Sequence, residues 1–132
     1  MSTFKSVDEA RGFFVGDKFA TNNGMVIDEI GDDYAICSMD IEEGHLNAAG
    51  GVMGGVIYTL ADFAFAVASN NMHKVTVAIT CNINYLSGSK GERLFAKAKC
   101  VKDGRTTSVF AVDVTDDLGK EIARFTGTGF KL

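Results

Sequence analysis

The chain has 132 residues, of which 46% are hydrophobic and 23% are charged. These proportions are typical of a globular domain, so they exclude a disordered tail, a collagen-like fibre and a coiled coil. The net charge of −4 argues against non-specific binding of nucleic acid, which depends on neutralising phosphates. The three cysteines and two histidines lack the spacing of a zinc or redox motif, so we expect no metal site, no cofactor and three reduced thiols.

Two features of the sequence bear on the location of the protein. The longest apolar run, residues 56–68, is interrupted by Asp62 and is too short to span a bilayer. The N-terminus lacks the apolar segment of a secretory signal. We therefore expect a soluble, cytoplasmic protein that does not contact a membrane. Proline, linkers and internal repeats are absent, so residues 1–132 are predicted to form a single domain.

The first half of the chain predicts one short helix and two strands. Ser6 and Glu9 have the spacing of a capping box, which predicts a helix over residues 6–14. Turn residues at 22–24 precede two runs of strand-forming residues, 25–30 and 34–41, and the second run alternates with a period of two. A glycine-rich loop is expected over residues 42–53.

The second half predicts one long helix followed by four strands. Residues 54–70 are apolar on nearly every face, which is typical of a buried helix, and residues 69–71 favour a turn at its end. The strand-like runs cover residues 75–86, 93–102, 106–115 and 121–131, and short turns such as Asp103-Gly104 predict an antiparallel meander. We expect an α+β fold in which a curved antiparallel sheet wraps one side of the central helix. A second copy of the chain would then cover the other side.

Asp62 is the first candidate for chemistry. Its neighbours one turn away on the helix are mostly apolar, and desolvation of such a carboxylate raises its pKa. Groups perturbed in this way are found at functional sites more often than chance predicts. The alternative is a structural aspartate that caps another element or accepts a hydrogen bond from a backbone amide.

The run Gly-Gly-Val-Met-Gly-Gly at residues 50–55 leads directly into this helix. The N–H groups of Gly54 and Gly55 lack partners within the helix and lie at its positive end, so they are candidate donors to an anion or oxyanion. The run is neither a P-loop nor a dinucleotide fingerprint. The alternative is a tight turn that only packs.

Spacing then restricts how these groups act together. Gly54 and Asp62 are eight residues apart on one helix, which corresponds to about 12 Å along its axis. They cannot both contact one carbonyl carbon within a single chain. If both serve one reaction, each site takes Asp62 from the partner subunit of a two-fold dimer.

The same residues carry a resemblance to a known family. Residues 45–55 read His-Leu-Asn-Ala-Ala-Gly-Gly-Val-Met-Gly-Gly, and Thr-Leu-Ala-Asp follows at 59–62. This pattern resembles the hotdog-fold acyl-CoA thioesterases of the PaaI-like (phenylacetate-pathway) type, whose signature is His-x-Asn-x-x-Gly-x-x-His-Gly-Gly and then Leu-x-Asp. Further similarity at residues 82–86, 91–96, 103–105, 119–123 and 126–128 extends the match over about residues 22–131.

The resemblance implies a hotdog fold and a role for each matching residue. Asp62 matches the catalytic carboxylate, which acts as a general base or nucleophile. Gly54 matches the residue whose N–H polarises the thioester carbonyl, and Asn47 the side chain that helps to hold the carbonyl or the attacking water. We also expect contacts with the substrate from Gly55, Met53, His45, Tyr58, Phe63, Lys90 and Arg105. The candidate partners for coenzyme A phosphates are Lys90, Arg93 and Arg105. The main role expected for His45 is to order the loop.

Two positions depart from the family pattern. Met53 stands where the family has the histidine before Gly-Gly, and methionine neither titrates nor donates a useful hydrogen bond. Ala78 stands where a serine or threonine often supports the carboxylate, and Thr59 or Thr80 is a candidate replacement for that hydroxyl.

Three functions are therefore compared. The first is a homodimeric or tetrameric acyl-CoA thioesterase acting on small to medium acyl or aryl thioesters. The second is a hotdog dehydratase or hydratase, which Met53 disfavours because that chemistry needs a histidine paired with an acidic residue. The third is a non-catalytic, acyl-thioester-binding hotdog dimer, which Asp62 disfavours. The sequence leaves the acyl group and the choice between dimer and tetramer open.

Overall fold

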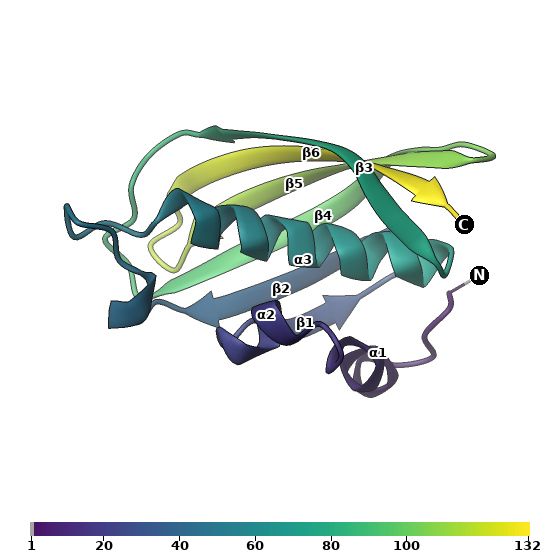
Figure 1. Cartoon of the computed structure of the whole chain (residues 1–132), viewed down its shortest axis with the longest axis horizontal. Helices are drawn as coiled ribbons and strands as arrows, with labels where there is room; N and C mark the ends of the chain where they lie inside the picture. The colour runs from purple at the N-terminus through teal and green to yellow at the C-terminus, as the bar shows by residue number, and fades with distance from the viewer. Residues whose placement is uncertain (1) are drawn as a thin grey trace.

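The computed structural model describes residues 2–132 and consists of one antiparallel sheet with a long helix against its concave face (Figure 1). The strands are β1 (Val26–Ile30), β2 (Tyr34–Asp40), β3 (Thr76–Tyr85), β4 (Arg93–Asp103), β5 (Thr107–Asp116) and β6 (Glu121–Lys131). The helices are α1 (Val7–Phe14), α2 (Lys18–Asn22) and α3 (Gly54–Met72), with a short 3₁₀ helix, η1, at Glu43–His45. The predicted arrangement, a curved sheet around one central helix, is confirmed.

The order of the strands corrects part of the prediction. The sheet runs β1-β2-β4-β5-β6-β3, so only β4, β5 and β6 form a meander. Strand β3 pairs with β6 and lies at the far edge, because α3 carries the chain from β2 across the whole sheet before β3 begins. The segment between β3 and β4 then returns the chain to β2.

Local hydrogen bonds explain where the helices begin and end. The Ser6 hydroxyl accepts a bond of 3.1 Å from the Glu9 N–H, as the capping motif predicts. Helix α3 continues past the expected turn to Met72, because Asn71 is fully buried and its side chain has two partners outside the helix. Its Oδ1 accepts from the Phe4 N–H and its Nδ2 donates to the Gly31 carbonyl. The sequence did not predict α2.

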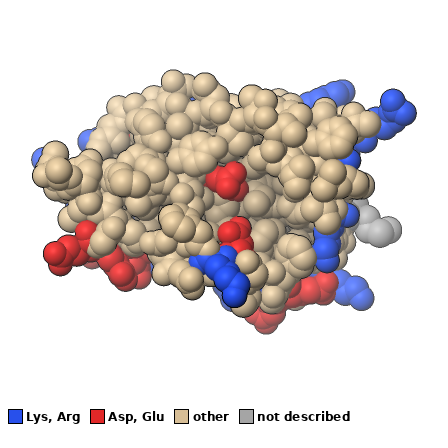
Figure 2. Space-filling view, viewed as in Figure 1, with Lys and Arg blue, Asp and Glu red and all other residues tan. Residues whose placement is uncertain are grey.

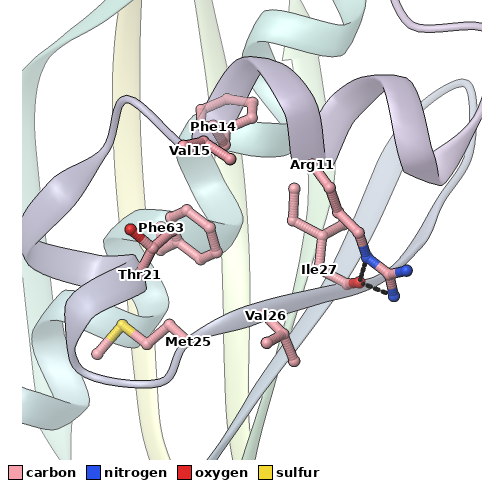
Figure 3. Close-up of a pocket in the computed structure, with 8 residues that line it drawn as sticks. All are labelled: Arg11, Phe14, Val15, Thr21, Met25, Val26, Ile27 and Phe63. Atoms are coloured by element: carbon pink, nitrogen blue, oxygen red, sulfur yellow. Dashed lines mark hydrogen bonds between the residues drawn. The ribbon is translucent and has the colours of Figure 1, made fainter.

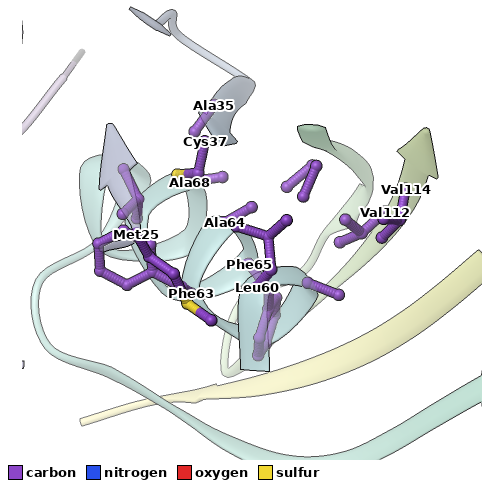
Figure 4. Close-up of a cluster of buried hydrophobic side chains, with 14 of the residues drawn as sticks. Met25, Ala35, Cys37, Leu60, Phe63, Ala64, Phe65, Ala68, Val112 and Val114 are labelled. Carbon is purple, nitrogen blue, oxygen red and sulfur yellow. The ribbon is translucent and has the colours of Figure 1, made fainter. Parts of the chain in front are cut away.

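The hydrophobic core lies between α3 and the sheet, where buried side chains of the helix gather with those of β2 and β5 (Figure 4). Phe65 contacts two aromatic rings of the sheet, with ring centroids 5.7 Å from Phe110 and 6.0 Å from Phe125. Gly127 of β6 faces the Phe65 ring, and a side chain there would come within 3.2 Å of it. The core therefore fixes both the depth and the rotation of α3.

The opposite side of α3 is not covered by the sheet. Gly55 is exposed, and Thr59, Asp62 and Ala66 are partly exposed, at the spacing of one helical face. Figure 2 shows this side of the molecule as a largely uncharged surface, with acidic groups near its centre and other charges mainly toward its ends and lower border. No helix within residues 2–132 is long and apolar enough to cross a membrane. The cytoplasmic location and the single domain remain predictions.

Candidate active site

The loop before α3 is held by a buried histidine. His45 is 5% exposed, and its ring Nδ1 accepts a hydrogen bond of 3.0 Å from the Glu42 N–H. Its carbonyl accepts a bond of 2.9 Å from the Met53 N–H, which closes the loop immediately before the helix. This geometry orders the loop and directs the chain into α3.

Asn47 occupies the turn of the same loop. Its Oδ1 accepts bonds from the Ala49 N–H at 2.9 Å and the Gly51 N–H at 3.1 Å. Gly50 has a φ of +85°, a conformation that favours glycine. The Nδ2 of Asn47 has no partner within the described residues and remains able to donate. The side chain thus shapes the loop with its oxygen and offers its amide nitrogen to a ligand.

The N-terminus of α3 presents two unpartnered donors. The N–H groups of Gly54 and Gly55 make no hydrogen bond to any residue in 2–132. Met53, the N-cap residue, provides no side-chain cap. The Tyr85 hydroxyl donates to the Gly54 carbonyl at 2.9 Å, and a Cβ on Gly54 would lie 3.1 Å from the tyrosine ring. The end of the helix is therefore a compact site with free, preorganised N–H groups.

Asp62 lies on the uncovered face of this helix, partly buried and without an ion pair or hydrogen bond to any described residue. Burial raises the pKa of its carboxyl, and the negative charge of Asp17 raises it further. Asp17 is the N-cap residue of α2, and its side chain makes no capping bond. The surroundings of Asp62 thus favour a carboxylate of increased basicity, and neither helix places a cation against it.

Tyr58 and Cys81 lie beside Asp62, where α3 meets β3. The neighbouring Cys81 thiol, together with burial, raises the pKa of Tyr58 to about 12. Burial raises the pKa of Cys81. The Tyr58 ring packs edge-on against Phe125, with 5.5 Å between centroids. At neutral pH both groups are therefore uncharged.

Neither threonine considered for the missing hydroxyl is placed to support Asp62 within one chain. The Thr59 hydroxyl donates to the Gly55 carbonyl at 2.7 Å. Residues of β3 alternate between its two faces, and Cys81 and Tyr85 contact α3. Thr80 therefore lies on the face turned away from the helix. Within a single chain, neither threonine replaces the hydroxyl that is missing at Ala78.

The comparisons with known proteins identify the family. Residues 49–123 match the thioesterase superfamily. A putative esterase from Archaeoglobus fulgidus is 39% identical over 105 residues, which are 79% of this chain and 68% of that protein. The chain belongs to the thioesterase superfamily.

Solved structures identify the branch of the superfamily and its fold. The PaaI protein from the phenylacetic acid degradation operon of Escherichia coli superimposes with a TM-score of 0.89 and 27% identity, covering 95% of this chain and 91% of that one. A hypothetical thioesterase protein with coenzyme A from Streptococcus pneumoniae has a TM-score of 0.83 and 28% identity, covering 90% and 94%. The chain is therefore a PaaI-like hotdog thioesterase, a hydrolase of thioesters.

Within this superfamily fold, two of the three candidate phosphate contacts, Lys90 and Arg105, are far apart. Lys90 follows β3, near the β4 residue Arg93, whereas Arg105 follows Asp103 at the other end of β4. Eleven strand residues separate these ends, a distance of about 35 Å. Lys90 and Arg105 of one chain cannot bind the same phosphate group, so the structure does not bring this pair together.

The loop that carries Lys90 is well fixed. The Ser89 hydroxyl donates to the Asp116 carboxylate at 2.7 Å, and the Glu92 N–H donates to Asp117 at 2.9 Å. Lys90 itself makes no ion pair within residues 2–132. Its ammonium group is therefore available to an anionic ligand. The Arg93 guanidinium is less available, because it donates hydrogen bonds to Asp40 and Ser38.

The aromatic residues expected near the acyl group differ in their surroundings. Tyr58 borders an apolar groove that also includes Met53 and Gly55. Phe63 is buried, packs edge-on against Phe14 with 5.8 Å between centroids, and lines a different cavity (Figure 3). Sequence reasoning missed Tyr85 and Asp17 as residues of the site. No local signal marks them, because both reach it from elements distant in the chain.

Proposed function

We propose that the chain is a homodimeric acyl-CoA thioesterase that hydrolyses small to medium acyl or aryl thioesters. One observation carries the proposal: a partly buried carboxylate of raised pKa shares the uncovered face of α3 with two unpartnered N–H groups at the start of that helix. The name of a further relative supports the substrate class. Acyl-coenzyme A thioesterase PaaI from Escherichia coli is 29% identical over 97% of this chain and 92% of its own length.

The dimer follows from what one chain lacks. Asp62 is about 12 Å from Gly54 along α3, so the partner subunit has to supply the carboxylate. Strand β3 is at the edge of the sheet and exposes Val77 and Ile79. Such an edge, next to an uncovered apolar helix, is suited to a second copy of the chain. Two such dimers can associate further into a tetramer.

The proposed reaction begins with the thioester carbonyl at the start of α3. The Gly54 N–H donates to the carbonyl oxygen and stabilises the charge that develops there, with further donors from Gly55 and Asn47. Asp62 from the other subunit takes a proton from water as the water oxygen attacks the carbonyl carbon. The carbon–sulfur bond then breaks, and the coenzyme A thiolate leaves without a strong general acid. In the alternative route, Asp62 attacks the carbonyl carbon and displaces the coenzyme A thiolate, and water then hydrolyses the resulting anhydride to the free acid and restores Asp62.

Lys90 is the candidate partner for the phosphates of coenzyme A. Its loop follows β3, whose last residue, Tyr85, touches the start of α3. The ammonium group is a mobile point charge that suits a phosphate. Arg105 lies at the opposite end of β4, so it is too far from Lys90 to contact the same phosphate.

A subunit-mixing experiment tests the composite site. Asp62→Asn removes the base and Gly54→Pro removes the donor, so each variant alone should release little free thiol from a panel of acyl-CoA and aroyl-CoA substrates. If each site uses both subunits, an equal mixture that reassorts at random contains intact sites only in its mixed dimers, and about a quarter of the native activity returns. No recovery in verified mixed dimers would contradict the composite site.

A non-catalytic acyl-thioester-binding dimer is the second candidate. Met53 in place of the family histidine favours it, together with the Thr59 hydroxyl, which bonds to Gly55 and not to Asp62. Native protein that binds coenzyme A thioesters but hydrolyses none of the panel would establish this function.

A further inference from the structure

Two apolar hollows lie next to one another over α3 and share one side chain, Met25. The first, here called the α3 groove, has a volume of about 340 Å³ and is lined by residues that include Met25, Met53, Gly55 and Tyr58. The second, here called the N-terminal cleft, has a volume of about 250 Å³ and is lined by Met25, Phe14, Val15, Ile27 and Phe63, with Arg11 at its edge (Figure 3).

Together the hollows form a path that starts at the proposed thioester site. Gly55 lines the α3 groove, and Phe63 lines the N-terminal cleft eight residues further along α3, about 12 Å away. Figure 3 shows Met25 beside Phe63 on one side of the cleft. Each hollow alone is close to the lower limit for small-molecule sites, about 300 Å³, but the two in series fall well within the usual range.

The polar groups of the N-terminal cleft already have partners. Arg11 donates through Nε and Nη2 to the Ile27 carbonyl at 2.9 and 2.7 Å. The Thr21 hydroxyl donates to the Asp17 carbonyl at 2.9 Å. A ligand in the cleft therefore meets mainly apolar atoms and no unpaired charge, which suits an alkyl chain.

We propose that the N-terminal cleft receives the distal end of a medium-chain acyl group whose thioester lies at Gly54, and that Met25 determines how far the chain reaches. This inference rests on the proposed thioesterase function and narrows its substrate class. A single aryl ring is accommodated in the α3 groove, whereas an octanoyl or decanoyl chain extends past Met25. Methionine is suited to this position because its unbranched side chain adapts to different neighbours.

The position of these residues in the chain also supports a role in specificity. All lining residues of the cleft except Phe63 come from residues 11–27, outside the 49–123 region that matches the superfamily. The catalytic candidates lie on the shared scaffold or immediately before it. The cleft is thus formed mainly by α1, α2 and β1, which precede the region that matches the superfamily.

The test uses S-alkyl-CoA thioethers, which bind without being hydrolysed, in a series from ethyl to decyl. In the native dimer, affinity measured by calorimetry should rise by about fourfold for each methylene group that the cleft buries. Val15→Trp fills the cleft from an exposed position, so the decyl compound should lose at least about tenfold in affinity while the ethyl compound is unaffected. Val101→Trp is the matched control, since Val101 is exposed on β4 and lies outside both hollows.

Hydrolysis provides a second readout. Met25→Ala should shift the chain-length optimum of kcat/KM toward longer acyl groups, because the smaller side chain opens the path between the hollows. Affinity that stops rising after butyl, or a Val15→Trp effect that is equal for ethyl and decyl, would overturn the assignment. Chain-length-dependent binding without any hydrolysis would instead refute the proposed function and leave the cleft assignment intact.

Discussion

Replacement of Gly54 by proline isolates the contribution of one N–H group. Gly54 is the first residue of α3, and its N–H has no partner within residues 2–132. Proline is favoured at this helix position and lacks the N–H. The preceding residue, Met53, has φ −61° and ψ 137°, an extended conformation compatible with a following proline. We therefore expect Gly54→Pro to fold and to lose mainly the donor.

The expected loss follows from the role of the donor. Removal of one oxyanion donor typically lowers kcat by about 10²–10³, equivalent to about 2.7–4 kcal/mol of transition-state stabilisation. The assay is steady-state release of free thiol from the best acyl-CoA substrate, with unfolding by urea as the test of integrity.

Gly54→Ala is the matched control for this prediction. Its Cβ meets the Tyr85 ring at the same 3.1 Å, but its N–H remains. If Gly54→Ala loses as much activity as Gly54→Pro, the effect is steric and the Gly54 N–H is not the donor. Native kcat in Gly54→Pro would refute the same assignment.

Three further predictions concern stability and the unusual methionine. Asn71→Ala leaves the Phe4 N–H and the Gly31 carbonyl unpaired, so urea unfolding should show a loss of about 1–3 kcal/mol for each group that stays buried. Burial raises the pKa of Asp62 above its ordinary 3.8, so the ionised carboxylate destabilises the fold at pH 7. Asp62→Asn should therefore have the larger free energy of unfolding at pH 7, and the difference between the two proteins should close as the pH falls below 3.8. A difference in stability that does not change with pH would contradict this cause. Met53→His places a hydrogen-bond donor beside the thioester site, and kcat for thiol release should rise at least about tenfold, an expectation that unchanged kcat with native affinity would refute.

Periodicity was sufficient to predict most elements but not their order in the sheet. The strand after α3 and the strands that follow it have similar patterns, and nothing local specifies whether β3 pairs with β4 or with β6. Helix α2 has only five residues, too few for a helical period to be recognised. The end of α3 was misplaced because Asn71 favours turns in isolation, but in the fold its amide bonds to two distant segments.

The candidate site was more accessible to sequence reasoning because its residues conflict with their local context. A carboxylate in an apolar helix and a pair of glycines at a helix start are both unfavourable choices for the helix that contains them. Tyr85 and Asp17 have no such conflict. Each gains its relation to the site only when β3 and α2 come to lie against α3.

The electrostatics of Asp62 connect the fold to the proposed reaction. Burial of the charged carboxylate raises its pKa, whereas an asparagine of the same shape carries no charge to desolvate. At neutral pH the native state with Asp62 is therefore less stable than it would be with asparagine at this position. Within residues 2–132 no cation forms an ion pair with Asp62, and the negative charge of Asp17 adds repulsion. An element that only had to pack would not retain such a group. A base that must take a proton from water gains from the same surroundings, because the raised pKa increases its affinity for the proton. The stability lost at Asp62 and the reactivity proposed for it therefore have one physical origin.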